Sequence, residues 1–541
     1  MAEKPYKAST DIFRGALILS AAAIIVKILS AAYRIPYQNI AGDIGFYIYQ
    51  QVYPFYGVAL TLSTIGFPVV ISKLIAERGS SEEDYTIKDI LTTAMIVLSS
   101  IGLLLFMALF LGADWIAGGM TDPGLSGLLK IIAFSYLLMP LSSVLRGYFQ
   151  GKHDMMPTAG SQVAEQSIRV ITILVLSTLF VQKGYSMYAV GKGAVFGSIT
   201  GGITGLALLL TFVLLRGEWK LFSPMIVKRS HFLSISKSLL FQGLAFCVTG
   251  LILILFQFVD SLHLYSLLRD SGMDEGEAKR WKGIYDRGQP LLQLGTVVVN
   301  SFALALVPVI AGFVRDRNDQ EILGKVRLVL RVSTTLGMAA TVGLVAMMRP
   351  VNYMLFTDSE GTGTLAIYSL SIVFTSLIMT TAAVIQCLGH SVTPVTITLI
   401  GVGIKWILDL ILVPHYHIAG AATSTVIAFM VMTILFYMVL KVHIKNPLFK
   451  KRHLFIIGKS TVYMGLAVVL FNEAYFWLMS SGESRLLATI QALAGVGLGA
   501  VIFLVIIIRT GLFTEEELSL IPAGLKVKRL IIMKNRGTKK C

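Results

Sequence analysis

The sequence contains few charged residues. Only 14% of its 541 residues are Asp, Glu, Lys or Arg, and 55% are hydrophobic. A typical soluble chain carries about 25% charged residues, and the mean hydropathy here is +0.76. These values exclude an ordinary soluble globular protein and indicate a polytopic membrane protein.

Cysteine and nucleotide-binding signals are also scarce. The three cysteines, at positions 247, 387 and 541, are too few for a disulfide framework. No Gly-rich loop with a phosphate-binding lysine occurs, so we do not expect ATP to drive this chain. His415 and His417 lack a third ligand nearby, and we expect no metal and no cofactor. The membrane potential or a coupled ion is left as the source of energy.

Apolar windows long enough to cross a bilayer recur along the whole chain. They predict an all-α fold of fourteen transmembrane helices. The predicted spans are 12–34, 45–76, 87–112, 125–149, 157–181, 187–215, 234–260, 284–314, 327–348, 364–388, 393–413, 419–441, 454–479 and 485–509. No segment between them is long enough for a catalytic domain, so we do not expect an enzyme.

The net charge of +16 follows from topology. If the N-terminus is cytoplasmic, the cytoplasmic segments hold 32 of the 46 Lys and Arg residues, a strong positive-inside bias. Both termini are then predicted to be cytoplasmic, and a nucleic-acid partner is not expected. The acidic and then basic tail, 514–541, is predicted to lie on anionic lipid.

An internal repeat predicts the domain organisation. Pro68 and Pro308, near the ends of the second and eighth spans, lie 240 residues apart, and Pro157 and Pro394, which begin the fifth and eleventh spans, lie 237 apart. Six helices is an even number, so the two halves share one orientation as parallel repeats. We therefore predict an N-terminal lobe over 1–230, a C-terminal lobe over 231–450, two further helices over 451–513 and the tail.

The first span carries two cations on one stripe. Lys27 and Arg34 lie one above the other at helical spacing, together with small and polar residues. A charge facing lipid at the bilayer centre costs at least about 2.5 kcal/mol, so this stripe is expected to face a bundle interior or a watery cavity. The alternative is that Lys27 snorkels to the interface or pairs with a neighbour.

Two further spans contain charged residues four apart. Glu165 and Arg169 have the spacing of an intrahelical ion pair, as do Lys405 and Asp409 in the corresponding span of the second half. Self-neutralisation is the favoured interpretation of Lys405 and Asp409. For Glu165 and Arg169 a functional role and a structural pair remain open.

The eighth span has a polar face, for which we favour a water-filled cavity over interhelical hydrogen bonding. Arg287 lies beside this face, and Asp260, at the outer end of the seventh span, is either a partner for the cations there or an interfacial group in water. The polar face of the eighth span consists of Asp286, Gln289, Gln293, Thr296 and Asn300.

Several tyrosines in the second span indicate an aromatic belt or, less simply, a sugar-stacking wall.

These patterns resemble the polysaccharide-exporter branch of the MOP superfamily, in particular the SpoVB/YtgP-like relatives of the lipid II flippases. The resemblance covers nearly the whole chain. The residues that carry it are Gly42, Tyr49, Gly66-Phe67-Pro68, Ser72-Lys73 and Ala76-Glu77 in the second span, Arg146-Gly147 and Gln150-Gly151 after the fourth, and Glu165-Gln166 with Arg169 in the fifth.

The resemblance implies two six-helix lobes around a central cavity, with the last two helices forming a groove for a lipid tail. It also implies that cavity cations bind a substrate diphosphate. Tyr285-Asp286-Arg287 matches the flippase pattern at the start of the eighth span, and Lys27 and Arg34 correspond loosely to an arginine pair in the first. The stretch 45–72 contains no arginine where the flippases have one.

Residues and resemblance together predict a flippase of the cytoplasmic membrane. The expected substrate is an undecaprenyl-diphosphate-linked saccharide, foremost lipid II, and the expected partners are membrane lipids and cell-wall synthesis enzymes. The alternatives are a cation-coupled multidrug antiporter, an exporter of another lipid-linked glycan, and a membrane glycosyltransferase. Lys27, Arg34 and Arg287 are predicted to bind the diphosphate; the predicted supporting or gating groups are Asp260, Asp286, Glu165, Arg169, Gln293 and Asn300.

Overall fold

The structure is a computed structural model and is almost entirely helical. It describes residues 4–77, 85–223, 225–297, 299, 319–390, 392–444, 447–478, 484–513 and 517, with the side chains of 4–14, 16 and 17 excepted. No strand occurs in these residues, which form two compact units. Because these units combine residues 1–290 with 391–424, and 291–390 with 425–541, they do not follow the predicted lobes, and the lobe boundaries stay predictions.

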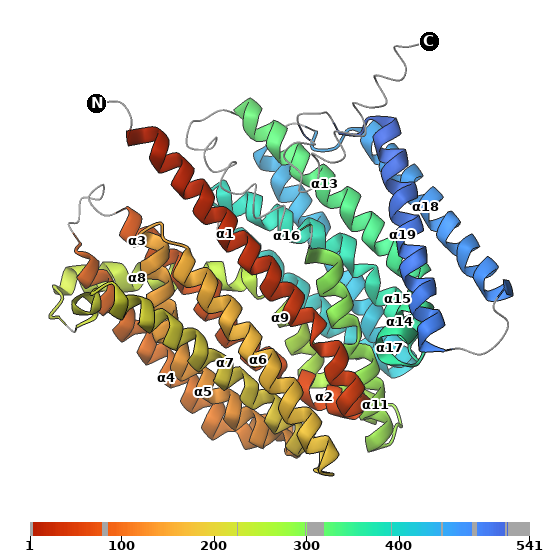
Figure 1. The fold of residues 1–541 in the computed structure, drawn as a ribbon, viewed down its shortest axis with the longest axis horizontal. Helices are drawn as coiled ribbons and strands as arrows, with labels where there is room; N and C mark the ends of the chain where they lie inside the picture. Colours follow the sequence, from red (N-terminus) through yellow and green to blue (C-terminus); the bar gives the residue numbers. More distant parts are fainter. Residues whose placement is uncertain are drawn as a thin grey trace. The chain divides into compact units, whose positions relative to one another are not determined.

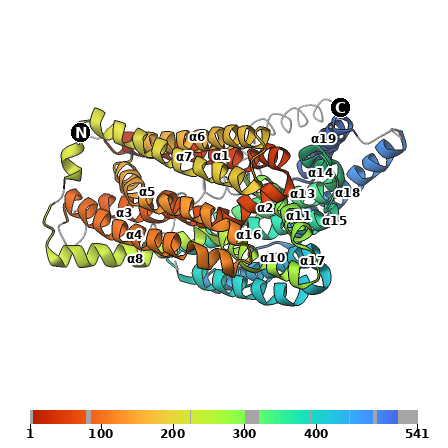
Figure 2. The same cartoon turned by 90° about the horizontal axis from the view of Figure 1, so that it is seen from below.

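The first unit contains the N-terminal helices and the beginning of α17 (Val392–His443). Within it, α6 packs along α7, and α1 lies along α6 (Figures 1 and 2). Its helices and turns are α1 (Lys4–Ala32), α2 (Arg34–Thr61), η1 (Leu62–Gly66), α3 (Phe67–Ala76), α4 (Ile87–Gly119), η2 (Pro123–Leu125), α5 (Ser126–Gly151), α6 (Met156–Gln182), α7 (Met187–Leu215), η3 (Trp219–Phe222), α8 (Arg229–Gly250), α9 (Ile252–Val259), η4 (Asp260–Leu264), α10 (Tyr265–Asp270) and α11 (Glu275–Asp286).

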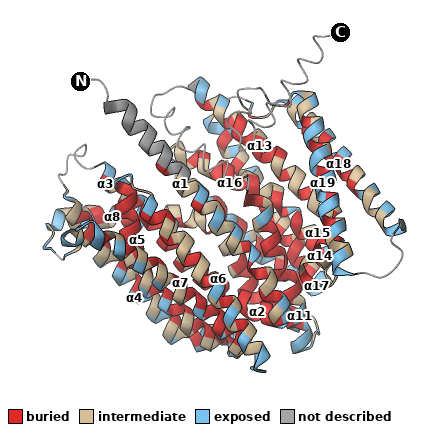
Figure 3. Ribbon diagram, viewed as in Figure 1, coloured by how far each residue is buried: buried red, intermediate tan, exposed pale blue. Residues whose placement is uncertain are grey.

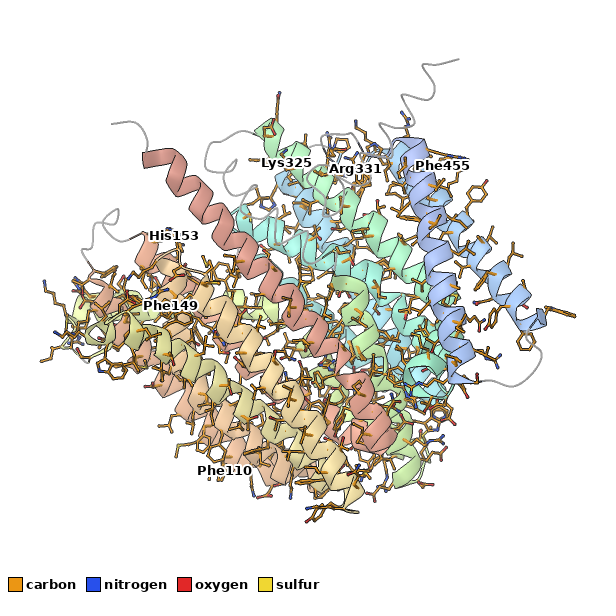
Figure 4. All side chains as sticks on the ribbon, in the orientation of Figure 1. Phe110, Phe149, His153, Lys325, Arg331 and Phe455 are labelled. Atoms are coloured by element: carbon orange, nitrogen blue, oxygen red, sulfur yellow. The ribbon has the colours of Figure 1, made fainter. Side chains whose placement is uncertain are left out.

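The second unit contains the remaining helices and the end of α17. The last two helices of the chain, α18 and α19, run side by side (Figure 1). Arg331, labelled in Figure 4, lies on α13. It forms an ion pair with Glu517 from the C-terminal tail; the rest of the predicted tail helix lies outside the described residues. The helices are α13 (Asp319–Ala346), α14 (Met348–Phe356), α15 (Thr362–Ser369), α16 (Ser371–Cys387), α18 (Lys451–Leu478) and α19 (Arg485–Thr510).

Local sequence signals explain where several helices begin and break. Thr86 and Asp89 form a reciprocal capping box at the start of α4. The chain turns at Gly42, whose φ of 67° is accessible to glycine at little cost. The long helix α17 is interrupted at His417, which takes a φ of 50° and separates the predicted eleventh and twelfth spans.

The predicted membrane architecture is confirmed approximately. In the described part of the chain, twelve helices are long and apolar enough to cross a membrane. Two of these, 18–76 and 392–443, each contain two predicted spans, whereas the predicted seventh span is divided between α8 and α9. The predicted eighth span falls largely outside the described residues.

Burial separates helices that build the interior from helices that face outward. Most residues of α2 are buried, including glutamines and tyrosines, whereas α19 exposes apolar residues along its length (Figure 3). On α4 the exposed residues include Leu104, Leu111 and Trp115. A helix with an apolar outer surface and a polar buried stripe is suited to lipid on one side and a functional interior on the other.

Candidate functional site

Arg34 is a buried cation that forms no ion pair with a carboxylate of the described residues. It begins α2, and its side chain has no exposed surface. Its guanidinium carbon lies 4.3 Å from the centroid of the Tyr53 ring, in a cation–π arrangement. None of its guanidinium nitrogens makes a hydrogen bond of good geometry to a described residue. The guanidinium of Arg34 therefore keeps unused hydrogen-bond donors.

Arg169, on α6, is a second cation of this kind. It is fully buried, and its Nη2 donates to the hydroxyl oxygens of Tyr33 at 3.2 Å and Tyr49 at 2.8 Å. Its guanidinium carbon lies 4.2 Å from the ring centroid of Tyr56 and 5.6 Å from that of Tyr53. Neutral hydroxyls and ring faces orient a guanidinium without cancelling its charge.

The two arginines share one tyrosine cluster. Tyr53 contacts both guanidiniums, and the hydroxyls of Tyr33 and Tyr49 lie 2.7 Å apart. Helical spacing puts Tyr49, Tyr53 and Tyr56 on one face of α2, and α6 packs against both α1 and α2. We call this set the two-arginine site; its members are Arg34, Arg169, Tyr33, Tyr49, Tyr53 and Tyr56.

The aromatic-belt interpretation is wrong for these tyrosines. Tyr49, Tyr53 and Tyr56 expose only 2%, 7% and 4% of their surfaces, whereas belt tyrosines present their rings to the lipid headgroups. They line the inside of the first unit, where their ring faces meet the arginines.

Of the two interpretations left open for Glu165 and Arg169, the ion pair within one helix is wrong. The Glu165 carboxylate instead accepts a hydrogen bond from Arg146 Nη2 at 2.6 Å, and both groups are buried. Arg146, at the end of α5, also donates to the carbonyl of Ser63 in η1 at 3.1 Å. Because Glu165 pairs with an arginine on the neighbouring helix, the described hydrogen-bond partners of Arg169 are the neutral Tyr33, Tyr49 and Gln166. Arg146 entered the sequence analysis only as part of a motif.

A hollow lined by hydroxyl groups adjoins Arg169. The hydroxyls of Tyr56 and Ser135 in its wall have no hydrogen-bond partner among the described residues. Tyr56 belongs to both the hollow and the two-arginine site. Hydroxyl groups without a described hydrogen-bond partner therefore extend from the Arg169 guanidinium into the hollow. The hollow is lined by Tyr56, Ala59, Leu60, Ser63, Ser135, Leu138, Met139, Ser142, Glu165, Ser198 and Gly202.

Arg287 is buried as predicted, but it is paired. Its Nη2 lies 2.7 Å and 2.8 Å from the two carboxylate oxygens of Asp43, and its Nε donates to one of them at 3.0 Å. One turn earlier, Lys282 Nζ lies 2.7 Å from both oxygens of Asp286. Lys27, the third predicted phosphate contact, is half-buried and makes no ion pair with a described residue.

A lysine ties the start of α11 to the rest of the unit. Lys279 donates to the Tyr188 hydroxyl at 2.8 Å and lies 3.6 Å from the buried Asp122. Its ammonium also donates to Glu275 at 2.6 Å, which lowers the pKa of that carboxyl. The helix that carries Arg287 is thus anchored at both ends.

Asp260 has a different partner from the one predicted. It is buried, which excludes an interfacial group in water, and its Oδ1 lies 2.8 Å from Lys405 Nζ. Its Oδ2 accepts a hydrogen bond from the Tyr285 hydroxyl at 3.0 Å. The predicted pair of Lys405 and Asp409 is confirmed at 3.0 Å.

Part of the polar face of the eighth span lies within the described residues. Gln289 is buried and accepts a hydrogen bond from Gln257 at 2.7 Å, which is the interhelical bonding that the sequence left as the alternative to a cavity. Gln293 belongs to the second unit and is half-buried. Asn300 lies outside the described residues, so its predicted role stays a prediction.

The described part of the chain is a polytopic helical membrane protein with buried arginines in its interior, and the comparisons with known proteins agree with this class. The chain belongs to the polysaccharide biosynthesis protein family, whose model matches residues 12–314. Its relatives include a flippase, and its fold matches those of transporters of the MOP superfamily, in agreement with the resemblance.

Three relatives come from Bacillus subtilis strain 168. The uncharacterized membrane protein YabM is 41% identical over 96% of this chain and 96% of its own length. Lipid II flippase MurJ is 25% identical over 92% of this chain and 95% of its own. Stage V sporulation protein B is 27% identical over 79% of this chain and 83% of its own.

Two solved structures share the fold. Lipid II flippase MurJ in an inward closed conformation matches with a TM-score of 0.66 and 16% identity, over 91% of this chain and 99% of the other. A multidrug resistance MATE family transporter in an inward-facing conformation matches with a TM-score of 0.63 and 17% identity, over 80% of this chain and 98% of the other.

Proposed function

We propose that this protein is a flippase for an undecaprenyl-diphosphate-linked saccharide, with lipid II as the first candidate, in the cytoplasmic membrane. The observation that carries the proposal is the two-arginine site, in which two fully buried guanidiniums have tyrosines around them and form no ion pair with a carboxylate of the described residues. A buried cation without a counter-ion is costly, and an anionic substrate group supplies the missing charge.

The chemistry of a diphosphate fits this site. Phosphate oxygens accept paired hydrogen bonds from the planar fork of an arginine, and such charge-assisted bonds contribute about 1.5–3 kcal/mol each. Arg34 and Arg169 each retain unused donors. The sugar has hydroxyl groups that hydrogen-bond to groups such as those of Tyr56 and Ser135 in the neighbouring hollow.

Arg287 takes part by exchanging partners. In this structure its fork holds the Asp43 carboxylate, so it contacts phosphate only when Asp43 gives way. Before substrate binds, the Asp43 carboxylate takes the place of the substrate phosphate. It neutralises the charge of Arg287 and accepts its hydrogen bonds while the site is empty. Lys27, half-buried on the stripe of α1, provides a further positive charge on the path of the headgroup.

The lipid tail stays in the membrane while the headgroup moves. A diphosphate with a sugar headgroup cannot cross about 30 Å of hydrocarbon unaided, and a cavity between rocking halves removes that barrier. The apolar outer surfaces of α18 and α19 are our candidates for the tail groove. The membrane potential, worth about 2.3 kcal/mol per charge per 100 mV, or a coupled ion resets the empty protein.

A cation-coupled multidrug antiporter shares the fold but has a different requirement. Its cationic substrates need acidic groups and aromatic faces, and the two-arginine site would repel them. An exporter of another diphosphate-linked glycan places the same demand on the arginines, and only the sugar distinguishes it from a lipid II flippase.

Transport by the full chain in liposomes tests the proposal. Lipid II labelled on its headgroup is placed in both leaflets, and a membrane-impermeant quencher is added outside. We expect the protected fraction to become accessible with the wild-type protein and not with Arg34→Gln or Arg169→Gln. Movement of another diphosphate-linked glycan but not of lipid II would favour the second glycan. Export of a cationic dye without movement of either lipid would overturn the proposal.

A further inference from the structure

Positively charged side chains gather where α13 packs against the start of α18. Figure 4 labels Arg331 on α13 and Phe455 near the start of α18, and the two lie at the same end of these helices. His453, on the first turn of α18, is close enough to three cations to interact with them electrostatically. We call this set the Arg331 site; its members are Arg331, Lys450, Arg452 and His453, all in the second unit.

Arg331 keeps a hydrogen-bond donor that the described residues leave unused. Its side chain exposes only 11% of its surface, and its Nη2 forms an ion pair with the Glu517 carboxylate. Its guanidinium carbon lies 5.0 Å from the centroid of the Phe513 ring. The buried Nε makes no hydrogen bond of good geometry to a described residue. Because a guanidinium can bind two oxygens of one phosphate through two of its nitrogens, this edge of Arg331 suits a phosphate group.

The first turn of α18 carries positive charge at the end of the helix that favours an anion. Lys450 directly precedes the helix, and its carbonyl oxygen accepts hydrogen bonds from the backbone N–H groups of His453 at 2.9 Å and Leu454 at 3.3 Å. This turn contains no acidic residue, and it exposes the side chains of Lys451 and Arg452. Cations are unfavourable at the positive end of the helix dipole, whereas an anion is stabilised there by the dipole and by the free N–H groups.

Tertiary contacts hold these cations together. Arg327, one turn before Arg331 on α13, donates from Nε and Nη2 to the carbonyl oxygen of Pro447 at 2.9 Å and 2.7 Å. Leu448, in the same turn of chain, is buried. These contacts fix the turn that carries Lys450 against α13. Because like charges repel, keeping them close is unfavourable until an anion joins them.

We propose that the Arg331 site binds the phosphate of an anionic phospholipid, and that the Glu517 carboxylate takes the place of this phosphate in the present structure. The phosphate oxygens accept hydrogen bonds from Arg331 and from the first turn of α18, while Lys450 and Arg452 add positive charge. Glu517 gives way when the phosphate enters. The positive-inside prediction puts this end of α13 and α18 on the cytoplasmic side, where anionic lipids attract basic segments.

The surface beside the site suits the acyl chains of a phospholipid. Phe455, Val462 and Leu466 expose 72%, 59% and 56% of their surfaces and lie on one face of α18. A phosphate at the Arg331 site and acyl chains along this face correspond to the headgroup and tails of one membrane lipid. The transported lipid is the other source of phosphate, but Lys450 and Arg452 are exposed at the surface rather than enclosed in an interior cavity. We therefore assign the site to a phospholipid of the surrounding bilayer.

Native mass spectrometry of the full chain tests the site by titration with phosphatidylglycerol or phosphatidylcholine. We expect the first phosphatidylglycerol to bind the wild-type protein at least about tenfold more tightly than Arg331→Gln, because a hydrogen bond to a charged group is lost. Phosphatidylcholine, which carries no net charge, should bind both proteins equally. Lys237→Gln, at an exposed position on α8, removes a positive charge elsewhere and is the matched control. Equal phosphatidylglycerol affinity of the wild type and Arg331→Gln would overturn the proposal.

Two further variants separate lipid binding from a purely structural role of the Arg331 ion pair. Glu517→Gln removes the competing carboxylate, so we expect phosphatidylglycerol to bind about two- to fivefold more tightly. Unchanged or weaker binding would show that Glu517 does not occupy the phosphate position. Lys450→Gln, at an exposed position, should weaken binding about two- to fivefold without changing the unfolding temperature. Its unchanged affinity would overturn the proposal even if Arg331→Gln fails to fold.

Farnesyl diphosphate, a probe for the diphosphate of the transported lipid, identifies the source of the phosphate. We expect Arg331→Gln to bind it as the wild type does, since the two-arginine site is unchanged. An equal loss of farnesyl diphosphate and phosphatidylglycerol binding would show that the Arg331 site receives the transported lipid, and would overturn the phospholipid assignment. Absence of farnesyl diphosphate binding by the wild type would count against the proposed function, while the phosphatidylglycerol titration still decides the Arg331 site.

Discussion

The guanidinium of Arg287 donates hydrogen bonds to both carboxylate oxygens of Asp43. Its Nη2 lies 2.7 Å from Oδ1 and 2.8 Å from Oδ2, and its Nε lies 3.0 Å from Oδ1. Arg287 has no exposed surface, and the Asp43 side chain exposes 13%. The pair joins the end of α11 to the turn in α2. The arginine that the sequence pattern offered most directly as a phosphate ligand is therefore the one already occupied.

Removing Arg287 alone is expected to cost both stability and transport. Arg287→Gln leaves the Asp43 carboxylate mostly buried without its partner, a loss of about 3–5 kcal/mol. The double variant Arg287→Gln with Asp43→Asn restores much of the stability but not lipid transport. Thermal unfolding and the liposome assay measure the two effects separately. Recovery of transport in the double variant would show that Arg287 serves only to hold Asp43.

Substitution of Arg34 or Arg169 is expected to weaken diphosphate binding without lowering stability. Since neither cation is neutralised by a carboxylate, Arg34→Met or Arg169→Met leaves the unfolding temperature unchanged or raised, whereas diphosphate binding falls about ten- to a hundredfold. Arg146→Met is the matched control, because it orphans Glu165 and lowers the unfolding temperature. A large loss of stability in the first two variants, equal to that of Arg146→Met, would assign them a structural role.

The hydroxyl of Tyr49 is expected to matter more than that of Tyr56. Tyr49 accepts a 2.8 Å hydrogen bond from Arg169, whereas the Tyr56 hydroxyl has no partner among the described residues. Loss of a hydrogen bond to a charged group costs about 1.5–3 kcal/mol, so Tyr49→Phe weakens farnesyl diphosphate binding at least about tenfold. Tyr56→Phe keeps the ring over Arg169 and preserves affinity. Equal effects from the two variants would contradict the assigned positioning role of Tyr49.

A glycine at the contact between α11 and α2 is expected to be intolerant of a methyl group. A Cβ on Gly283 would lie 2.2 Å from the backbone oxygen of Asp43, so one helix has to move. Gly283→Ala should lower the unfolding temperature and disturb the Arg287 pair, although alanine favours helices by about 1 kcal/mol. Gly276→Ala on the same helix, with 3.4 Å to a side-chain oxygen, is the control and should be neutral or stabilising.

The sequence predicted the secondary structure well because membrane crossing imposes a strong local rule. A long apolar window must become a helix to satisfy its backbone groups in lipid, so windows such as 87–112 and 187–215 correspond directly to α4 and α7. The break between the eleventh and twelfth spans is visible in Pro414 and the polar residues around it, and it is realised at His417. The pair of Lys405 and Asp409 was equally accessible, since it lies within one helix.

The ion pairs between different helices could not be predicted from the spacing of residues within one helix. Helical spacing allowed Glu165 to pair with Arg169, but in the structure Glu165 pairs with Arg146 on the adjacent helix. Asp43, which neutralises Arg287, lies 244 residues away along the chain. His263, whose Nε2 lies 3.2 Å from Asp409, was missed altogether; its only sequence signal was its position one turn after Asp260 near the end of an apolar span.

The sequence alone determined that this chain is a helical membrane protein with charged residues inside its spans, because the number of apolar windows and the charges inside them are properties of local composition. Only the tertiary structure decided which of those cations are neutralised. Ion pairing depends on the few ångströms between side chains of packed helices, and that distance is set by how α2, α6, α11 and α17 meet rather than by the spacing of residues along any one of them.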